Sequence, residues 1–361
     1  MSAIRTPPSG DLSAGGLNAS VVVIVKNGEA TVARCIQSLL VQTRGSEIIV
    51  VDGNSSDATR EIVNRFPVIL VRAPSHDSYG ISRNLGVRSA SGEVILFMDA
   101  DDLAGPTWCE SLVRNFVNPH VGIVTVPRRP DKIQGWFMET LSLEYSGLQS
   151  VGNSYEKDWR QVTTKGTAWL KKAIGEAGGF DESMFFGTED KDLAYRIVNL
   201  GYKVVEEPAE EVLVTPVGSV MNFLRDKFWR AGVGHGYFRA KHGLFRPPLS
   251  GIGSLALLML GAYLFAHQWT IGVLGVPLAF LSSWRLVREG MSLYQESGRL
   301  LRVLAFILVK WVSRILEFVG FIVGFVMGWS MGRSKRSRKS STICGLNDNV
   351  QVRDSVDDGV D

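Results

Sequence analysis

The fold is decided by the stretch Glu93-Val94-Ile95-Leu96-Phe97-Met98-Asp99-Ala100-Asp101-Asp102. Its five consecutive apolar residues indicate a strand buried on both faces, as in a parallel sheet. Three carboxylates follow at the point where this strand would leave the sheet. Asp99 and Asp101 are two residues apart, so on an extended chain their side chains point the same way. In open α/β sheets, ligands bind beyond the carboxyl ends of the strands.

Two hard oxygen ligands so placed suit Mg²⁺ or Mn²⁺, with substrate phosphates completing the coordination shell. The alternative interpretation is that Asp-Ala-Asp-Asp is a polar loop whose carboxylates only cap a helix. The motif by itself leaves both interpretations open.

The chain before this strand alternates between short apolar runs and helical patterns. This alternation predicts an α/β fold with a parallel central sheet and helices on both faces. A Gly-x-Gly-x-x-Gly sequence does not follow the first strand, so the dinucleotide fingerprint is missing. Expected strands are 21–25, 47–51, 68–71, 94–98 and 121–126, and expected helices include 30–41 and 79–90.

Composition excludes several classes of protein. With 361 residues, one domain plus a further element is the natural expectation. A net charge of +3 is too small to indicate a nucleic-acid partner. The 3 cysteines have no zinc spacing and favour a reducing compartment. The first twenty residues have no apolar core, so we expect no signal peptide and a cytoplasmic N-terminal domain.

Polar side chains recur at the ends of three predicted strands, at Asn27, Asp52 and Asp99. A nucleotide base, its ribose and a metal-bound diphosphate would need such groups. The sequences around these ends, 23–39, 48–59, 82–93 and 97–102, resemble family 2 glycosyltransferases in the same order and spacing. The resemblance covers about 20–245. It implies a GT-A fold, which is a Rossmann-like nucleotide-sugar domain with a mostly parallel central sheet.

The resemblance also implies roles for individual residues. The donor-binding residues would be Asn27, Asp52, Arg83, Asn84 and Asp99, and Asp101 would be the direct ligand of a divalent cation (Mn²⁺ or Mg²⁺), with Asp99 assisting. The general base would be Asp190, within the family's Thr-Glu-Asp motif. Residues on the acceptor side would be Gly166, Thr167, Glu189, Asp192, Trp229 and Arg230. The alternative for Glu189, Asp190 and Asp192 is that they only cap a helix, where the dipole favours carboxylates.

The C-terminal third has the composition of a membrane protein. Basic and aromatic residues alternate over 219–247, as expected for an amphipathic helix at a membrane surface. The run 249–284 carries no Asp, Glu, Lys or Arg and is flanked by arginines. We expect it to form a transmembrane hairpin with both ends in the cytoplasm. A further apolar helix is expected over 300–331, and the number of crossings stays open.

These patterns divide the chain into five parts. They are a disordered lead-in (1–19), the glycosyltransferase domain (20–218), the juxtamembrane helix (219–247), the transmembrane region (248–332) and a disordered tail (333–361). The function expected from the resemblance is that of a multi-pass membrane enzyme of cell-envelope glycan biosynthesis. It would move a sugar, with inversion, from a nucleotide-diphosphate donor to a hydroxyl of a lipid-linked or cell-surface glycan.

Three alternatives remain. A polyprenyl-phosphate glycosyltransferase, similar to dolichol-phosphate mannose synthase, would need no general base, because its acceptor is already an anion. A processive polysaccharide synthase would need more membrane spans than the short apolar region provides. A membrane scaffold that binds nucleotide sugars without turnover would not need both Asp101 and Asp190. The expected partners are therefore the sugar donor, a lipid-linked or glycan acceptor and membrane lipids, without nucleic acid.

Overall fold

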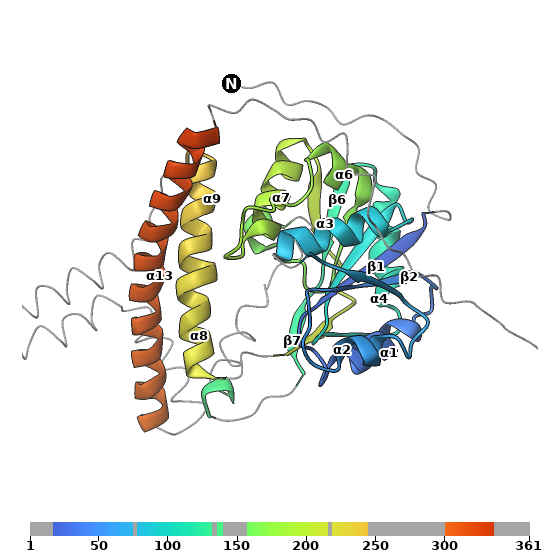
Figure 1. Ribbon diagram of the computed structural model, residues 1–361, viewed down its shortest axis with the longest axis horizontal. Coiled ribbons are helices and arrows are strands. Elements are labelled where there is room, and N and C mark those ends of the chain that lie inside the picture. Colours follow the sequence, from blue (N-terminus) through green and yellow to red (C-terminus); the bar gives the residue numbers. More distant parts are fainter. Residues whose placement is uncertain are drawn as a thin grey trace, which may run out of the picture.

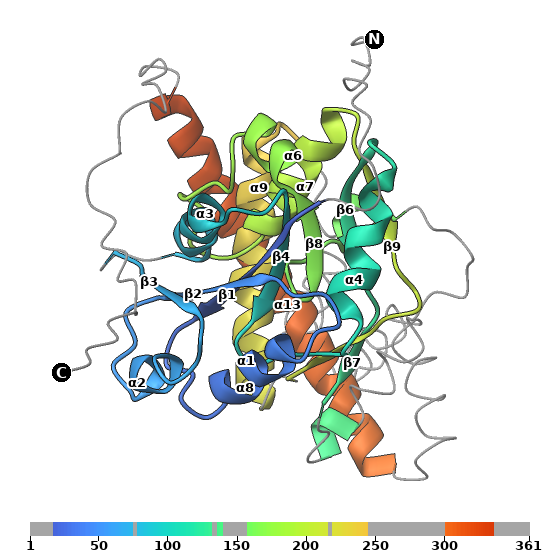
Figure 2. The same ribbon diagram turned by 90° about the vertical axis from the view of Figure 1, so that its right-hand side faces the viewer.

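A computed structural model describes residues 17–74, 78–131, 136–139, 157–215, 219–244 and 300–335. A seven-stranded sheet in the order β3-β2-β1-β4-β8-β6-β9 forms the centre of the described structure (Figure 2). Its strands are β1 (Ala19–Val25), β2 (Glu47–Asp52), β3 (Ile69–Arg72), β4 (Val94–Asp99), β6 (Val121–Thr125), β8 (Thr167–Leu170) and β9 (Lys203–Glu206). A smaller sheet joins β5 (Leu103–Ala104), β10 (Val212–Val214) and β7 (Arg128–Pro130).

The central sheet is mostly parallel, which confirms the sequence prediction. Strands β1, β2, β3 and β4 all run in parallel, and β6 pairs in parallel with β9. The exception is β8, which is antiparallel to both β4 and β6. Residues of β1 and β4 are almost all buried, as their unbroken apolar sequences predict.

Helices flank this sheet. They are α1 (Val32–Leu40), α2 (Thr59–Val63), α3 (Tyr79–Ser89), α4 (Trp108–Val113), α6 (Lys171–Glu176) and α7 (Glu189–Asn199), with short 3₁₀ turns η1 (Arg114–Val117) and η2 (Trp159–Gln161). The Ser78 side chain begins α3 by accepting a hydrogen bond from the backbone N–H of Ile81. Such capping satisfies an amide that the first turn of a helix leaves unpaired.

An aromatic cluster holds the antiparallel strand β8 against β4. The Phe97 ring meets the Trp169 ring edge-on at 6.1 Å and the Phe180 ring at 5.4 Å. Both Phe97 and Trp169 are buried. Because Phe97 is two residues before Asp99, this packing fixes the end of β4 that carries the carboxylates.

The C-terminal part of the described structure is a pair of long helical segments. One consists of α8 (Val220–Asp226), the π-helical η3 (Lys227–Gly234) and α9 (His235–Lys241), which follow one another without a break. The other is α13 (Leu300–Lys335). Figure 1 shows the two segments side by side, beside α7 and away from α1 and α2. Within the described residues, the helices expected in 219–247 and 300–331 are therefore present over Val220–Lys241 and Leu300–Lys335.

The structure bears on only part of the predicted transmembrane region. Among the helices within the described ranges, none has the combination of length and apolar composition needed to cross a membrane. The segment 300–331, which the sequence assigns to the transmembrane region with the number of crossings open, is helical but does not meet that requirement. The hairpin predicted for 249–284, the lead-in up to residue 16 and the tail beyond residue 335 lie outside the described residues.

Candidate active site

The ends of β1, β2 and β4 bring the predicted donor-binding residues to one edge of the sheet. Val25 pairs with Asp52, and Ile24 pairs with Asp99. Asn27 lies two residues beyond the end of β1. Because neighbouring parallel strands end at the same edge, these three polar side chains lie along one line, in agreement with the sequence prediction.

Asn27 and Asp52 stabilise the loop that follows β2. The side-chain oxygen of Asn27 accepts a hydrogen bond from the backbone N–H of Ser56 at 2.9 Å, with Asn27 in the left-handed region at φ 52°. The buried carboxylate of Asp52 accepts from the backbone N–H of Ser55 at 3.2 Å and lies 3.9 Å from Arg60. These contacts fix the conformation of the loop at the carboxyl edge of the sheet.

Asp99, Asp101 and Asp102 form one cluster, in which the nearest carboxylate oxygens lie within 4.8 Å of one another. The antiparallel register opposes Phe97 to Thr167, so Lys165 lies opposite Asp99. The Lys165 ammonium is 2.8 Å from Asp99, 3.3 Å from Asp102 and 3.9 Å from Asp101. Within the described residues, these carboxylates are close enough together to hold a metal ion, and carboxylate oxygens suit Mg²⁺ or Mn²⁺.

The carboxylates of the cluster differ in pKa. Burial alone would raise the pKa of Asp99, but the charges of Lys165 and Arg83 hold it below its usual value. Burial raises the pKa of Asp101. Burial, together with the charges of Asp99 and Asp101, raises the pKa of Asp102 to about 7. Asp99 is therefore the carboxylate held most firmly in its charged form.

Two arginines flank the cluster. The buried Arg83 is ion-paired with Glu189 and lies 3.8 Å from Asp99. Arg230, on η3, donates a hydrogen bond to the hydroxyl of Tyr79 at 2.8 Å, and its guanidinium lies 5.1 Å from the centre of that ring. Arg83 lies 5.5 Å from the same ring centre. Tyr79 thus packs against both guanidinium groups. The two arginines place positive charge near the acidic cluster.

The Gly187-Thr188-Glu189-Asp190 turn begins α7. Thr188 is left-handed at φ 69°, an uncommon conformation for a threonine and one that costs free energy. The two carboxylates of this turn have different surroundings. Glu189 is buried and ion-paired with Arg83, while Asp190 is partly exposed. One oxygen of Glu189 has no hydrogen-bond partner among the described residues. Burial and the charge of Asp190 raise the pKa of Glu189.

Several predicted site residues also make structural contacts. Asn84 holds α3 to the loop before α7 by donating to the Phe180 carbonyl and accepting from its N–H, both at 2.9 Å. Thr167 donates to the Thr163 carbonyl at 2.9 Å. The buried Asp192 faces away toward α9, where it binds Lys241 and His242, each at 2.7 Å, and it also pairs with Arg196 on its own helix. Their predicted roles at donor or acceptor stay predictions.

Gly166 and Trp229 are placed by close packing. Gly166 has φ 65°, and a Cβ there would lie 2.4 Å from Val212, so only glycine fits without movement. The Trp229 ring stacks on Phe186 with centres 5.2 Å apart. Trp229 is partly exposed, and Phe186 lies two residues before Thr188, so the stacked pair lies near the Thr188 turn. The role of Trp229 on the acceptor side stays a prediction.

Two residues near the acidic cluster, Lys165 and Tyr79, were not predicted from the sequence as site residues. Lys165 was visible next to Gly166 in the sequence, but its position depends on the antiparallel direction of β8. Tyr79 opens α3 four residues before Arg83, a spacing that places both on one helix face. That spacing was the available signal for Tyr79.

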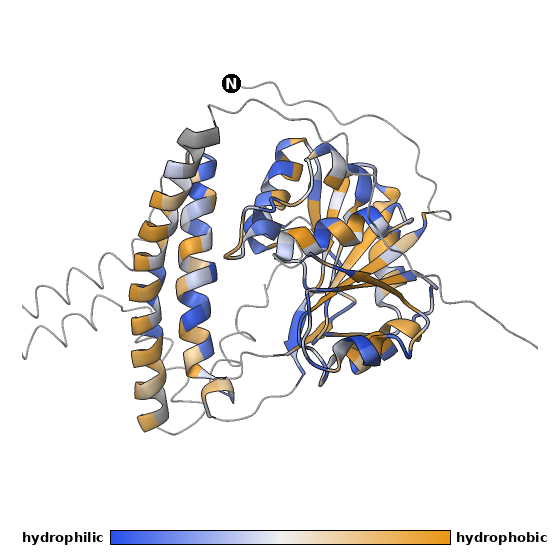
Figure 3. Cartoon of the chain, viewed as in Figure 1, coloured by the Kyte–Doolittle hydropathy of each residue, from blue (hydrophilic) through white to orange (hydrophobic). Residues whose placement is uncertain are grey.

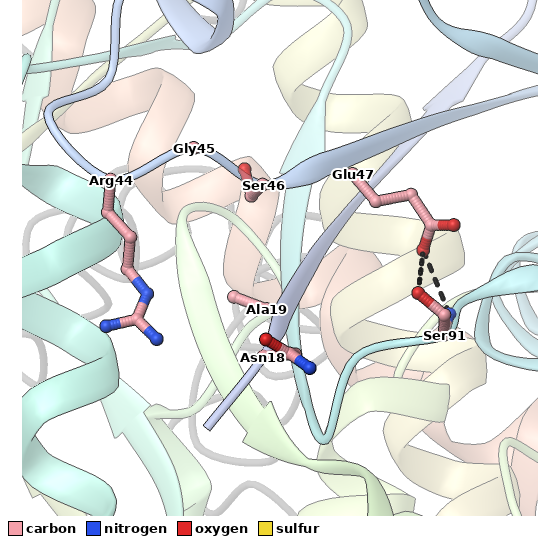
Figure 4. A pocket seen from close by; sticks show the side chains of 7 residues that line it. All are labelled: Asn18, Ala19, Arg44, Gly45, Ser46, Glu47 and Ser91. Atoms are coloured by element: carbon pink, nitrogen blue, oxygen red, sulfur yellow. Dashed lines mark hydrogen bonds between the residues drawn. The ribbon is translucent and has the colours of Figure 1, made fainter. Parts of the chain in front are cut away.

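A pocket of about 300 Å³ lies elsewhere, at the opposite edge of the sheet (Figure 4). It is lined by Asn18, Ala19, Arg44, Gly45, Ser46, Glu47 and Ser91. The Glu47 carboxylate there accepts from the backbone N–H of Ser91 at 2.9 Å and from the Ser20 hydroxyl at 2.6 Å. These bonds join the beginnings of β1 and β2, so the Glu47 carboxylate of this pocket stabilises the fold.

The mostly parallel sheet, with its acidic carboxyl edge, defines a GT-A-like α/β domain. Residues 20–177 match the family model described as Glycosyl transferase family 2. Residues 20–177 therefore form a family 2 glycosyltransferase domain, which confirms the resemblance over that part of the chain. The structure of a mannosyltransferase from Pyrobaculum calidifontis is similar with a TM-score of 0.55 and 18% identity, covering 86% of this chain and 87% of that chain. At this identity the likeness concerns the fold.

Two curated relatives extend the comparison. Pre-mycofactocin glycosyltransferase from Mycobacterium tuberculosis is 27% identical over 213 residues, which covers 56% of this chain and 43% of that protein. Succinoglycan biosynthesis protein ExoA from Rhizobium meliloti is 24% identical over 271 residues, covering 69% of this chain and 79% of that protein. The matched region thus spans less than half of the mycobacterial relative.

Proposed function

We propose that the protein is an inverting glycosyltransferase that moves a sugar from a nucleoside-diphosphate donor to a hydroxyl group of a lipid-linked or cell-surface glycan. The observation that carries the proposal is the cluster of Asp99, Asp101 and Asp102 at the carboxyl edge of β4 in a family 2 domain. A complex with GDP-Man and Mn²⁺ is the form of the Pyrobaculum structure, which supports a donor and a metal of these classes.

On the donor side, Asn27 and Asp52 would hold the nucleoside. Asp101 and Asp99 would hold Mg²⁺ or Mn²⁺, which supplies Lewis-acid neutralisation of the charge on the departing diphosphate. Arg83 is 3.8 Å from Asp99 and would pair with phosphate oxygens. Arg230, which the sequence predicts on the acceptor side, lies close enough to lower the pKa of Asp99, so we propose that it also faces the phosphates. Several positive charges would then surround the departing nucleoside diphosphate and stabilise its developing negative charge.

On the acceptor side, Asp190 would be the general base. It is the partly exposed carboxylate of the turn, whereas Glu189 is committed to Arg83. A sugar hydroxyl must lose its proton as the new bond forms, and Asp190 would take that proton. A single base and one displacement lead to inversion at the anomeric carbon, in contrast to the two-carboxylate chemistry of retaining hydrolases.

The test is Asp190→Asn, which keeps the shape and capping ability of the side chain. We expect turnover to fall by ~10²-fold or more, within the usual contribution of a positioned base. Nucleotide affinity should hardly change. Transfer of labelled sugar to the glycans of a membrane fraction measures turnover, and calorimetry measures nucleotide binding. Asp158→Asn is the control, because this exposed aspartate also accepts a backbone N–H at the start of a helical element, the 3₁₀ turn η2.

The outcome separates the alternatives. Near-normal turnover by Asp190→Asn would make Asp190 a helix cap and would favour an acceptor that is already ionised, such as a polyprenyl phosphate. Binding of nucleotide sugars by the wild-type protein without any transfer would favour the scaffold that binds without turnover.

We also propose that the chain is attached to the cell membrane through 249–284, with the glycosyltransferase domain in the cytoplasm. The absence of charged residues from this sequence and its flanking arginines support the attachment. A further support is the apolar composition of α13, whose ribbon is mostly in the hydrophobic colours of Figure 3. Its exposed apolar side chains are Leu301, Leu304, Leu308, Val319, Ile322, Val323, Val326 and Trp329. Carbonate extraction of membranes tests the proposal, and full-length protein recovered wholly in the soluble fraction would contradict it.

A further inference from the structure

Lys165 is the charged group closest to the acidic cluster. Its ammonium donates a hydrogen bond to Asp102 at 3.3 Å and lies 2.8 Å from Asp99. Asp101 is 3.9 Å away. One ammonium therefore faces all three carboxylates, and it is largely shielded from water, with 28% of its side chain exposed.

The backbone at Lys165 is held firmly in place. The next residue, Gly166, has φ 65°, and its carbonyl accepts a hydrogen bond from the Trp108 indole at 3.1 Å. The Lys165 N–H itself points to the Thr163 hydroxyl at 3.4 Å. The side chain can therefore move only by rotating its own bonds, while the Cα of Lys165 stays beside the cluster. Four flexible methylene groups allow the ammonium to swing by several ångströms.

A divalent cation on Asp99 and Asp101 would need the oxygens that the ammonium faces. Two cations cannot share these oxygens without strong repulsion at such short distances. Asp99 has one oxygen directed to Lys165 and the other 3.8 Å from Arg83, so it has no second oxygen remote from a cation.

We propose that Lys165 is an internal cation that competes with the divalent metal for these carboxylates and must swing away before the metal binds. This inference rests on the proposed metal-dependent donor site. It predicts that Lys165 weakens the affinity for the bare metal. A nucleoside diphosphate offers the displaced ammonium new anionic partners, so donor and metal are expected to bind cooperatively. Lys165 is thus a positioning and regulating residue of the donor site.

The experiment measures Mn²⁺ binding by the full-length protein without nucleotide, from the loss of the electron paramagnetic resonance signal of free Mn²⁺. Lys165→Met should bind Mn²⁺ ~10-fold to 100-fold more tightly than wild type, the range that one charge-assisted hydrogen bond represents. Lys165→Gln should behave in the same way and serves if Lys165→Met does not fold. Lys165→Arg keeps the charge and should remain weak.

Lys172→Met is the matched control, because this exposed lysine lies just beyond β8 and pairs with Glu176. Its Mn²⁺ affinity should equal that of wild type. Equal or weaker binding by both neutral Lys165 variants overturns the inference and leaves the metal site itself standing. If Mn²⁺ binds to none of the proteins, with or without added UDP or GDP, both the inference and the proposed metal role are wrong.

Discussion

Three glycines on α13 allow it to approach the neighbouring helical segment at backbone distance. Gly320, Gly324 and Gly328 are four residues apart and so share one face. A Cβ built at Gly324 would lie 1.9 Å from the carbonyl oxygen of Val233 on η3 and 2.6 Å from its carbonyl carbon. Both atoms belong to the backbone, so no side-chain rotation can relieve the contact. Replacing Gly324 must push the two helices apart.

The expected magnitude follows from two opposing effects. Alanine stabilises a helix by about 0.5–1 kcal/mol relative to glycine. Overpacking a close contact costs about 1–3 kcal/mol. The contact at Gly324 is far inside van der Waals distance, so the upper part of that range applies. Gly324→Ala should therefore lower the free energy of unfolding by on the order of 1–2 kcal/mol, despite its better helix propensity.

Gly175→Ala in α6 is the matched control. A Cβ there would meet nothing within 4 Å, so the propensity gain should appear alone and stabilise the protein by about 0.5–1 kcal/mol. Urea unfolding of both full-length variants in the same detergent compares the midpoints. Hydrogen exchange of η3 amides reports whether the helix contact itself has loosened. If Gly324→Ala stabilises as much as Gly175→Ala, without faster exchange in η3, the described packing of α13 is wrong.

Two further predictions concern carboxylates. Asp101→Asn should abolish activity together with the Mn²⁺ dependence of nucleoside-diphosphate binding; calorimetry with and without Mn²⁺ checks this, and equal wild-type affinities in both conditions would contradict the metal assignment. Asp192→Asn should cost about 3–5 kcal/mol at neutral pH, since it leaves Lys241, His242 and Arg196 without their buried anion. Burial by itself would raise the pKa of Asp192, but the hydrogen bonds and charges of these partners hold that pKa well below its usual value. The contribution of Asp192 to the free energy of unfolding is therefore fully present above about pH 4 and is lost as the pH falls through the folded-state pKa. Unfolding measured at neutral and at acidic pH should show the variant's deficit shrinking.

The sequence predicted the fold and the donor edge because both depend on local patterns. Unbroken apolar runs indicate buried parallel strands, and parallel strands end at one edge. The pairing of Val25 with Asp52 and of Ile24 with Asp99 in the structure agrees with that rule.

The position of Lys165 could not be predicted in the same way. Its proximity to Asp99 requires β8 to run antiparallel to β4, and the sequence Thr167-Ala168-Trp169-Leu170 does not encode a direction. The pairing joins residues far apart in the chain, and their relative register is fixed by tertiary packing, including the Phe97–Trp169 contact. Local patterns therefore predict the residues of one strand end, but they do not predict which distant residue faces it.

The division between glycosyltransferase domain and C-terminal helices was drawn from hydropathy, which is insensitive to glycine contacts. Glycines on two faces of η3 allow close backbone contacts. A Cβ at Gly232 would meet Gly320 on α13, and a Cβ at Gly234 would lie 3.0 Å from the Gly187 carbonyl oxygen. The helix η3 is thus held between α13 and the turn that carries Asp190. Its π-helical stretch, a form often found at functional sites, also carries Arg230. If 249–284 attaches the chain to a membrane as proposed, the attachment begins only a few residues after the helical segment that packs on the Gly187–Thr188 part of this turn. The C-terminal helices would then support the turn that carries the proposed base, in addition to anchoring the chain.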